Sequence, residues 1–471
     1  MHGSSPRPRT TRSGLALVAS LATALVVGLA VLATNQSAAA RLPSGRDTGR
    51  AAQAKVHKVT VNPRLFGVHD AYLHSLSRPG TGSIRLWDTG TAWPQMQPTS
   101  GSIDYSRLDE VVRAAHAHHT EVTLVVALTP AWAAASSAHT APTDAPRLTA
   151  FKSYLSAVMK HYRNFFGPGK RGIANYQVWN EANIATFWTG SYAELGQLVK
   201  TVHDVRDQVD PGAKVVAPAM VTRLTYQQNG IKAFYKTQVD GRPVWRYVDA
   251  LSFNLYPLDQ YPNPDPTRMG TPEDSMALLS TVKGILAKDR VSKTLPIWNT
   301  EINYGLRFGA NGGKPAAQIP VSRQVAYVIR TYLLNAARGV KRVDWYSYDM
   351  STRGGLGAIG NTLLTDPVDP ASGSLLAAGR AFTRVQSWMK GTLVGTTSKR
   401  PCIRDRHGTY TCTIRYAKGT GRVYWNPYHR AKVRLVKSAT RKIDQYGDRS
   451  KAKGGSRLRV GYRPVLVRST Q

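Results

Sequence analysis

Eight short apolar runs alternate along this chain with segments in which apolar residues recur every three or four positions. The first pattern is typical of strands buried in a parallel sheet, and the second is typical of helices that cover one. Eight such repeats predict an α/β fold, a closed (β/α)8 barrel. The expected strands span residues 65–69, 83–87, 121–128, 175–180, 214–217, 250–255, 295–300 and 342–348.

The barrel is expected to occupy residues 62–390 and to end with a helix over 374–389. After Lys390 the sequence changes to short alternating runs, such as 410–416, that are interrupted by Gly and Pro. This pattern predicts a small β-sandwich over residues 391–471. Residues 41–61 form a leader, and its last six residues are expected to add a strand to the sandwich.

Residues 1–40 have the features of an export signal: three arginines, an apolar stretch over 14–33, and the small-residue sequence Ser37-Ala38-Ala39-Ala40. Because about twenty apolar residues can cross a bilayer, an uncleaved membrane anchor is the alternative. In both cases the body of the protein is expected outside the cytoplasm, either secreted or held at the membrane.

The chain has two cysteines, Cys402 and Cys412, on either side of a His407-Gly408 turn. In an exported protein such a pair is expected to form a disulfide across a hairpin. No second pair of Cys or His completes a tetrahedral metal site nearby, so we expect no metal and no cofactor.

The charge is strongly basic, with 63 Lys and Arg against 28 Asp and Glu and a formal net charge of +35. Residues 390–471 contain 21 of the basic residues and only three acidic ones. Two interpretations remain open: a solvated surface, or a surface that binds an anionic cell-wall or capsular polymer. No helix-turn-helix, zinc-finger or RNA-binding motif accompanies the charge, so nucleic acid is not an expected partner.

Two of the six glutamates end apolar runs in nearly the same way, Glu181 after 176–180 and Glu301 after 295–300. Catalytic groups of parallel barrels lie where the strands end, so both carboxylates are expected at the barrel mouth. One carboxyl that donates a proton and another that attacks carbon are what cleavage of a sugar acetal needs. The other four, Glu110, Glu121, Glu194 and Glu273, are expected to be solvated.

Three motifs resemble those of one group of enzymes. They are Trp179-Asn180-Glu181-Ala182-Asn183 followed by Phe187-Trp188, Thr129-Pro130-Ala131-Trp132, and Ser83-Ile84-Arg85-Leu86-Trp87. In this order they resemble the retaining glycoside hydrolases of the (β/α)8-barrel clan A, most closely family 39 and its bacterial exopolysaccharide-hydrolase relatives. The resemblance extends over residues 66–391. Ala182 departs from it, because a proline commonly follows the first glutamate.

The resemblance implies that Glu181 is the general acid/base and Glu301 the nucleophile. It also implies that Asn180 binds the sugar hydroxyl beside the reacting carbon, and that Arg85 and Tyr256 support the nucleophile. The remaining candidates are expected to contact the sugar: Trp345 as the platform, Trp132 and His69. The apolar face of a pyranose stacks on an aromatic ring, and its hydroxyls need polar partners. For each of the three, structural packing is the alternative.

The sequence therefore predicts a secreted retaining β-glycosidase, an O-glycosyl hydrolase of a polysaccharide or oligosaccharide that uses two glutamates in a double displacement. Two alternatives remain: a non-catalytic cell-surface protein that binds an acidic glycan, and transglycosylation through the same intermediate. The sugar and the linkage depend on loops at the barrel mouth, over residues 259–270, 305–320 and 349–365, in which we find no signature.

Overall fold

The computed structural model describes residues 56–69, 80–136, 142–257, 270–304, 319–349, 362–366, 372–396 and 399–470 of the 471-residue chain. The expected export signal, most of the leader and most of the three mouth loops lie outside these ranges. None of the helices in the described part of the chain combines the length and the apolar character needed to cross a bilayer.

Eight parallel strands form the barrel, in the order that the apolar runs predict. They are β2 (Phe66–His69), β3 (Ser83–Leu86), β4 (Glu121–Val126), β5 (Asn175–Val178), β6 (Lys214–Val216), β10 (Leu251–Asn254), β11 (Ile297–Ile302) and β12 (Arg342–Trp345). Each pairs in parallel with its neighbour, β12 pairs with β2, and a parallel bridge from Val216 to Ala250 closes the ring. A two-residue strand, β7 (Met220–Val221), pairs beside β10 and was not predicted. The expected fold class is confirmed.

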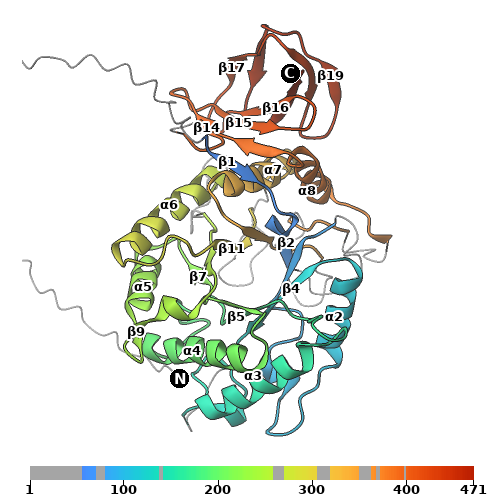
Figure 1. The fold of residues 1–471 in the computed structure, drawn as a ribbon. Coiled ribbons are helices and arrows are strands. Elements are labelled where there is room, and N and C mark those ends of the chain that lie inside the picture. The colour runs from blue at the N-terminus through green and yellow to red at the C-terminus, as the bar shows by residue number, and fades with distance from the viewer. Residues whose placement is uncertain are drawn as a thin grey trace, which may run out of the picture. The chain divides into compact units, whose positions relative to one another are not determined.

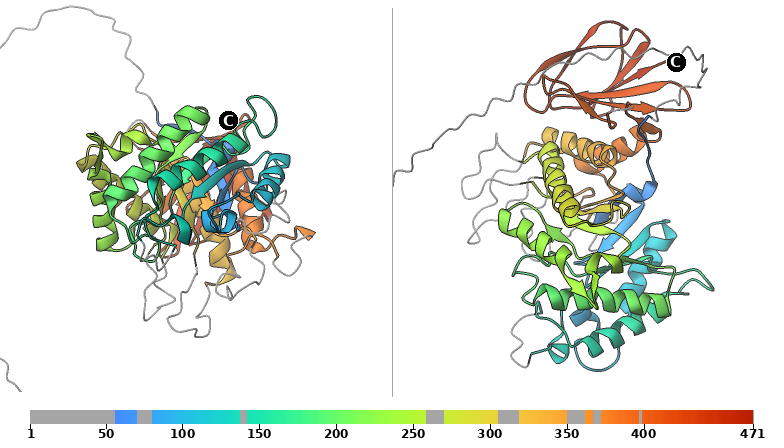
Figure 2. Two further views of the ribbon diagram at one scale, coloured as in Figure 1. Left: turned by 90° about the horizontal axis from the view of Figure 1, so that it is seen from below. Right: turned by 60° about the vertical axis from the view of Figure 1, so that its left-hand side comes forward.

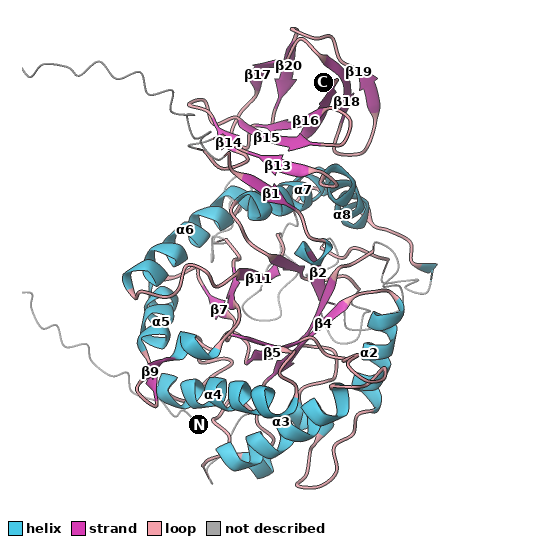
Figure 3. Ribbon diagram, viewed as in Figure 1, coloured by secondary structure: helices cyan, strands magenta, loops and turns pink. Residues whose placement is uncertain are grey.

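Helices surround this ring of strands (Figures 1 and 3). They are α1 (Trp93–Met96), α2 (Ser106–Ala117), α3 (Leu148–Tyr162), α4 (Tyr192–Val209), α5 (Thr225–Lys236), α6 (Pro272–Lys288), α7 (Val321–Ala337) and α8 (Ala377–Trp388). Their starts follow ordinary capping chemistry. In α6, for example, the Thr271 hydroxyl accepts from the Asp274 amide, Asp274 bonds back to Thr271, and Pro272 occupies the first helical position.

The C-terminal residues form an antiparallel sheet domain beside α7 and α8 (Figure 2). Its larger sheet contains β13 (Thr392–Val394), β14 (Ile403–Arg404), β15 (Tyr410–Arg415), β16 (Thr420–Trp425), β18 (Ala439–Ile443), β19 (Arg449–Lys451) and β21 (Val465–Ser469). The smaller sheet pairs β17 (Ala431–Arg434) with β20 (Arg457–Val460), and an apolar cluster that includes Tyr424, Leu435 and Val460 packs between the two. Cys402 and Cys412 form the expected disulfide.

The sheet domain also includes a strand from before the barrel. Strand β1 (Lys58–Thr60), in the segment expected to add a strand, pairs antiparallel with β13, with Lys58 opposite Val394. The barrel is therefore flanked on both sides in the sequence by neighbouring strands of one sheet.

A buried ion pair joins the barrel helices to the sheet domain. Glu273 of α6 and Arg330 of α7 form a salt bridge, in which Arg330 Nε donates to Glu273 Oε1 at 3.0 Å. The same oxygen accepts from Trp425 Nε1 of β16 at 2.8 Å. The side chain of Arg330 is fully buried and that of Glu273 is 3% exposed, so the expectation of a solvated Glu273 was wrong. Its partners are distant in sequence, which local patterns do not reveal.

Candidate active site

Polar side chains from five strands meet at the carboxyl ends of the barrel strands. The strands are β2, β3, β5, β10 and β11, and each side chain is on one of the last two residues of its strand or follows the strand by two or three residues. The set contains His69, Arg85, Gln177, Asn180, Glu181, Asn254, Tyr256 and Glu301. Six of the eight were predicted from the sequence.

Arg85 is the hub of this cluster. Its Nε donates to Gln177 Oε1 at 2.6 Å, its Nη2 donates to Asn180 Oδ1 at 2.7 Å, and its Nη1 lies 3.2 Å from Glu301 Oε2. The side chain is completely buried. A buried guanidinium is stable only when its donors are satisfied and a counter-charge is near, and these three acceptors meet that need.

Glu301 receives a hydrogen bond on each carboxylate oxygen. Arg85 reaches Oε2, and the Tyr256 hydroxyl donates to Oε1 at 2.9 Å. Both partners stabilise the ionised carboxylate. The side chain of Glu301 remains 13% exposed, so part of it is accessible to solvent, whereas the side chain of Arg85 is not accessible. This environment suits a nucleophile.

Glu181 has a neutral partner instead. Asn254 Nδ2 donates to Glu181 Oε1 at 2.9 Å, and Asn254 Oδ1 accepts from the Thr300 hydroxyl at 2.9 Å. Since Thr300 precedes Glu301, a short chain of hydrogen bonds and one peptide unit links the two carboxyls. Sequence reasoning missed Asn254, although it ends a strand two residues before Tyr256. Its position at a strand end was the available signal.

The turn after β5 holds Glu181 in place. Trp179 and Glu181 both have left-handed backbone conformations, with φ of 59° and 43°, which are uncommon for residues other than glycine. Backbone bonds fix the turn: Trp179 N–H donates to Val126 O at 3.0 Å, and Ala182 N–H donates to Ala219 O at 3.1 Å. A proline at position 182 would lack this second donor. In this chain a hydrogen bond therefore restrains the loop at the position where the motif that the sequence resembles commonly has proline.

Burial raises the pKa of both carboxyls. The charge of Glu181 raises the pKa of Glu301 further, whereas Arg85 and Tyr256 act in the opposite direction. At Glu181, the Asn254 hydrogen bond and the charges of Arg223 and Arg85 only partly offset burial. Two carboxyls coupled in this way release their protons in two steps that belong to the pair. The cationic and hydroxyl donors lie on Glu301, so we expect the last proton to reside on Glu181.

His69, the member of the cluster that ends β2, is completely buried. Its Nε2 is 2.8 Å from Thr300 O and 3.3 Å from Arg85 Nη1, and Tyr346 packs edge-on against its ring. Burial, followed by the charge of Arg85, holds the pKa of His69 well below its usual value, so the ring is neutral. These contacts give His69 a role in positioning Arg85 and the strand that carries Glu301.

The candidate tryptophans differ in their surroundings. Trp345 ends β12, is completely buried, and donates from Nε1 to Thr362 O at 2.7 Å. Trp132 packs edge-on against Trp93 and donates to Gln97 O at 2.9 Å. It lines a cavity with residues of the 97–105 segment and of α3, none of which is another candidate site residue.

Sequence reasoning also missed a second acidic group near Glu301. Asp88 follows β3 and accepts from the Tyr346 hydroxyl at 2.7 Å. Burial raises the pKa of Asp88, and its charge contributes to the raised pKa of Glu301.

Glu121, like Glu273, was expected to be solvated, and this expectation was wrong. Its carboxylate is paired with Arg64 and Arg342.

Comparison with solved structures confirms the kind of barrel that the sequence motifs suggest. The fold is similar to a family 39 glycoside hydrolase from Bacteroides cellulosilyticus WH2 (17% identity, TM-score 0.62, 87% of this chain and 81% of that chain). It is also similar to a glucosidase from Croceicoccus marinus (13%, 0.59, 89% and 99%) and to the GH39 enzyme from Xanthomonas axonopodis pv. citri (13%, 0.58, 88% and 96%). No protein-family model and no curated protein matches the sequence.

Proposed function

We propose that this protein is a secreted retaining β-glycosidase of the family 39 type, which hydrolyses a polysaccharide or oligosaccharide. One observation carries the proposal. At the carboxyl ends of two strands of a glycosidase-like barrel, one buried glutamate is held by a guanidinium and a phenol while the other is held by an amide. This difference separates the two roles that acetal cleavage requires.

In the first step a Glu301 oxygen attacks the anomeric carbon. The glycosidic C–O bond breaks, and Glu181 gives its proton to the departing oxygen, which leaves a glycosyl ester on Glu301. In the second step a water molecule attacks the same carbon. It gives a proton to Glu181, and the ester C–O bond breaks to restore the Glu301 carboxylate. Two inversions at one carbon retain its configuration.

Other residues have supporting roles in this proposal. Arg85 and Tyr256 stabilise the ionised Glu301 carboxylate before attack, and they stabilise it again when the ester breaks. Because Arg85 engages Asn180 Oδ1, the Asn180 amide hydrogens remain for a sugar hydroxyl beside the reacting carbon. Trp345, at the end of β12, was the expected platform beneath that sugar, but its complete burial favours the alternative of structural packing.

Export is the proposed route by which the protein meets such a substrate. The Cys402–Cys412 disulfide is consistent with an oxidising compartment, and the basic, apolar and small-residue segments of residues 1–40 provide the signal. Whether that signal is cut or stays as an anchor decides between a secreted and a membrane-held enzyme.

The function is tested by incubating the purified protein with neutral and acidic polysaccharides and measuring new reducing ends together with co-sedimentation. We expect new reducing ends from at least one β-linked polymer, with products that retain the β configuration when first formed, as proton NMR reports. Co-sedimentation without new ends across the panel would support a binding protein and contradict the proposal. Products extended by added acceptor sugars would identify transglycosylation.

The pH dependence of kcat/KM should be bell-shaped. The rate is expected to rise as the pair loses its first proton and Glu301 ionises, then to fall as Glu181 loses the second. Burial and mutual repulsion raise the pKa of the pair, so the falling limb should lie well above the value of about 4.3 that is usual for glutamate. With an aryl glycoside whose departing phenol needs no protonation, Glu181→Gln should remove the falling limb from the glycosylation step. An unchanged limb would contradict the assignment of Glu181.

A further inference from the structure

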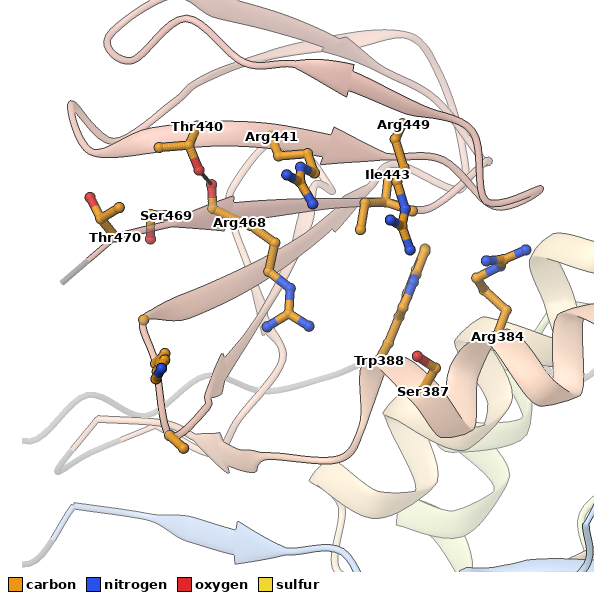
Figure 4. Close-up of a pocket in the computed structure, with 13 residues that line it drawn as sticks. Arg384, Ser387, Trp388, Thr440, Arg441, Ile443, Arg449, Arg468, Ser469 and Thr470 are labelled. Atoms are coloured by element: carbon orange, nitrogen blue, oxygen red, sulfur yellow. Dashed lines mark hydrogen bonds between the residues drawn. The ribbon is translucent and has the colours of Figure 1, made fainter.

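The sheet domain contains a cavity that the catalytic proposal does not use. It has a volume of about 640 Å³ and lies between the last turns of α8 and the strands β18, β19 and β21 (Figure 4). Five cationic side chains line it, and no acidic side chain does: Arg384, Lys418, Arg441, Arg449 and Arg468. This volume is in the range of sites for small organic ligands.

The strand register concentrates this charge. Arg441 of β18 and Arg468 of β21 are directly opposite each other in the antiparallel pair, and Arg449 of β19 is opposite Ile443 of β18. Like charges at opposed positions destabilise a sheet. Arg468 gains a partial offset by stacking its guanidinium 3.4 Å above the Tyr416 ring. Stacking leaves the in-plane N–H donors of Arg468 available.

The cations have no acidic partners in the part of the chain that the structure describes. None of the five forms an ion pair with another described residue. The nearby Asp444 uses its Oδ1 within its own turn, where this oxygen accepts from the amides of Tyr446, Gly447 and Asp448. The positive potential of the cavity is therefore not neutralised locally.

Arg384 is already held at the edge of the cavity. Its Nη2 donates to Tyr446 O at 2.7 Å, while its buried Nε has no hydrogen-bond partner. Gly447, with φ of 101°, gives the guanidinium space that a Cβ would fill. An orphaned buried donor is costly in the unliganded protein.

Hydroxyl groups accompany the guanidinium groups. Ser387 of α8, Thr440 of β18 and Thr470 after β21 line the same cavity, and all three are exposed. Guanidinium groups bind carboxylate and phosphate through paired hydrogen bonds, and neighbouring hydroxyls suit the hydroxyls of a sugar. The combination matches an anion carried on a polyhydroxylated chain better than a free inorganic ion.

We propose that this cavity is a binding site for an acidic glycan, which contacts it through carboxylate or phosphate groups on the chain. Helices of such barrels run from the mouth to the opposite end, so the last turns of α8 lie away from the ends of β5 and β11 that carry the glutamates. A polymer bound here leaves the mouth open. The site therefore acts as a tether that holds the protein on an anionic matrix, and it does not depend on the proposed hydrolysis.

The test compares two double variants of the whole protein. Arg441→Ala/Arg449→Ala removes two exposed charges from the cavity, and Lys432→Ala/Arg434→Ala removes two exposed charges from β17 of the same domain. Binding is measured by calorimetry with three probes, an oligogalacturonate, a glycerol-phosphate oligomer and a short DNA duplex, and circular dichroism checks that each variant is folded. We expect the cavity variant to weaken binding of one of the first two probes at least about tenfold and the control to weaken it less than about twofold.

The preferred probe identifies whether carboxylate or phosphate is recognised. Equal losses in the two variants would show that only diffuse charge binds the polymer, and this would overturn the proposal. It would also fail if neither acidic glycan bound, or if DNA bound most tightly and depended on Arg441 and Arg449. Cleavage of a small neutral substrate should be the same in both variants, which separates this result from a failure of the catalytic proposal.

Discussion

Glu301→Gln should abolish hydrolysis. The amide cannot form the glycosyl ester, so kcat/KM is expected to fall by a factor on the order of 10⁴ or more, the scale on which loss of an essential nucleophile acts. The change keeps the size of the side chain; the amide oxygen can keep the Arg85 contact, and the Tyr256 hydroxyl can accept from the amide nitrogen. The measurement is kcat/KM for an aryl β-glycoside and for whichever polymer of the panel is cleaved.

Glu110→Gln is the matched control. Glu110 lies on α2, its side chain is 66% exposed, and it forms an ion pair with Arg107 in the same helix. We expect unchanged kinetics and unchanged stability for this variant. If Glu301→Gln kept more than about a hundredth of the activity while Glu110→Gln was normal, the assignment of the nucleophile would be wrong.

Glu181→Ala should fail in a different way. On a substrate with a good leaving group this variant still forms the ester but lacks the base that activates water. Added azide, which needs no base, should therefore restore turnover and yield a β-glycosyl azide. The same addition to a variant without the nucleophile should instead give the opposite anomer or nothing. A rescue pattern with the two positions exchanged would reverse the roles of Glu181 and Glu301.

The second large effect concerns stability. Glu273→Ala should lower the free energy of unfolding by about 3–5 kcal/mol, because it leaves the Arg330 guanidinium buried without its counter-charge. It also removes the acceptor of Trp425 Nε1. Urea unfolding, followed by tryptophan fluorescence and circular dichroism, measures the change.

Replacing both Glu273 and Arg330 separates two quantities: the cost of leaving the Arg330 charge unpaired, and the contribution of the salt bridge to stability. Glu273→Met/Arg330→Met removes both charges and fills similar space, so it should recover a large part of the loss. Glu194→Ala, an exposed capping residue at the start of α4, should cost only about 1 kcal/mol. A loss below that value in Glu273→Ala would show that the pair contributes little to stability.

The fold was predictable because buried parallel strands leave long apolar runs between amphipathic helices. The predicted run 83–87 corresponds to β3, and 295–300 overlaps β11, although its boundaries shift by two residues. Short exposed strands were less visible. Strands β19 and β20 carry basic residues on nearly every second position, so no apolar alternation identified them.

The site was predictable to the extent that its residues belong to motifs. Glu181, Glu301 and Arg85 stand in recognisable sequence contexts, and the structure brings Arg85 to Glu301. Gln177 and Asn254 were not singled out by any motif, although Asn254 ends a strand, because their importance comes from contacts across the barrel with residues 92 and 73 positions away. Glu273 was misjudged for the same reason, because Trp425 is 152 positions distant.

The pairing of β1 with β13 has a practical consequence for dissecting this protein. A truncation after the barrel would leave Lys58–Thr60 without its neighbour, and a fragment that began at residue 391 would lack its first strand. Neither piece is a severable module. The sheet contains strands from both sides of the barrel in the sequence. An isolated sheet domain would therefore need residues 58–60 joined to the fragment that begins at 391.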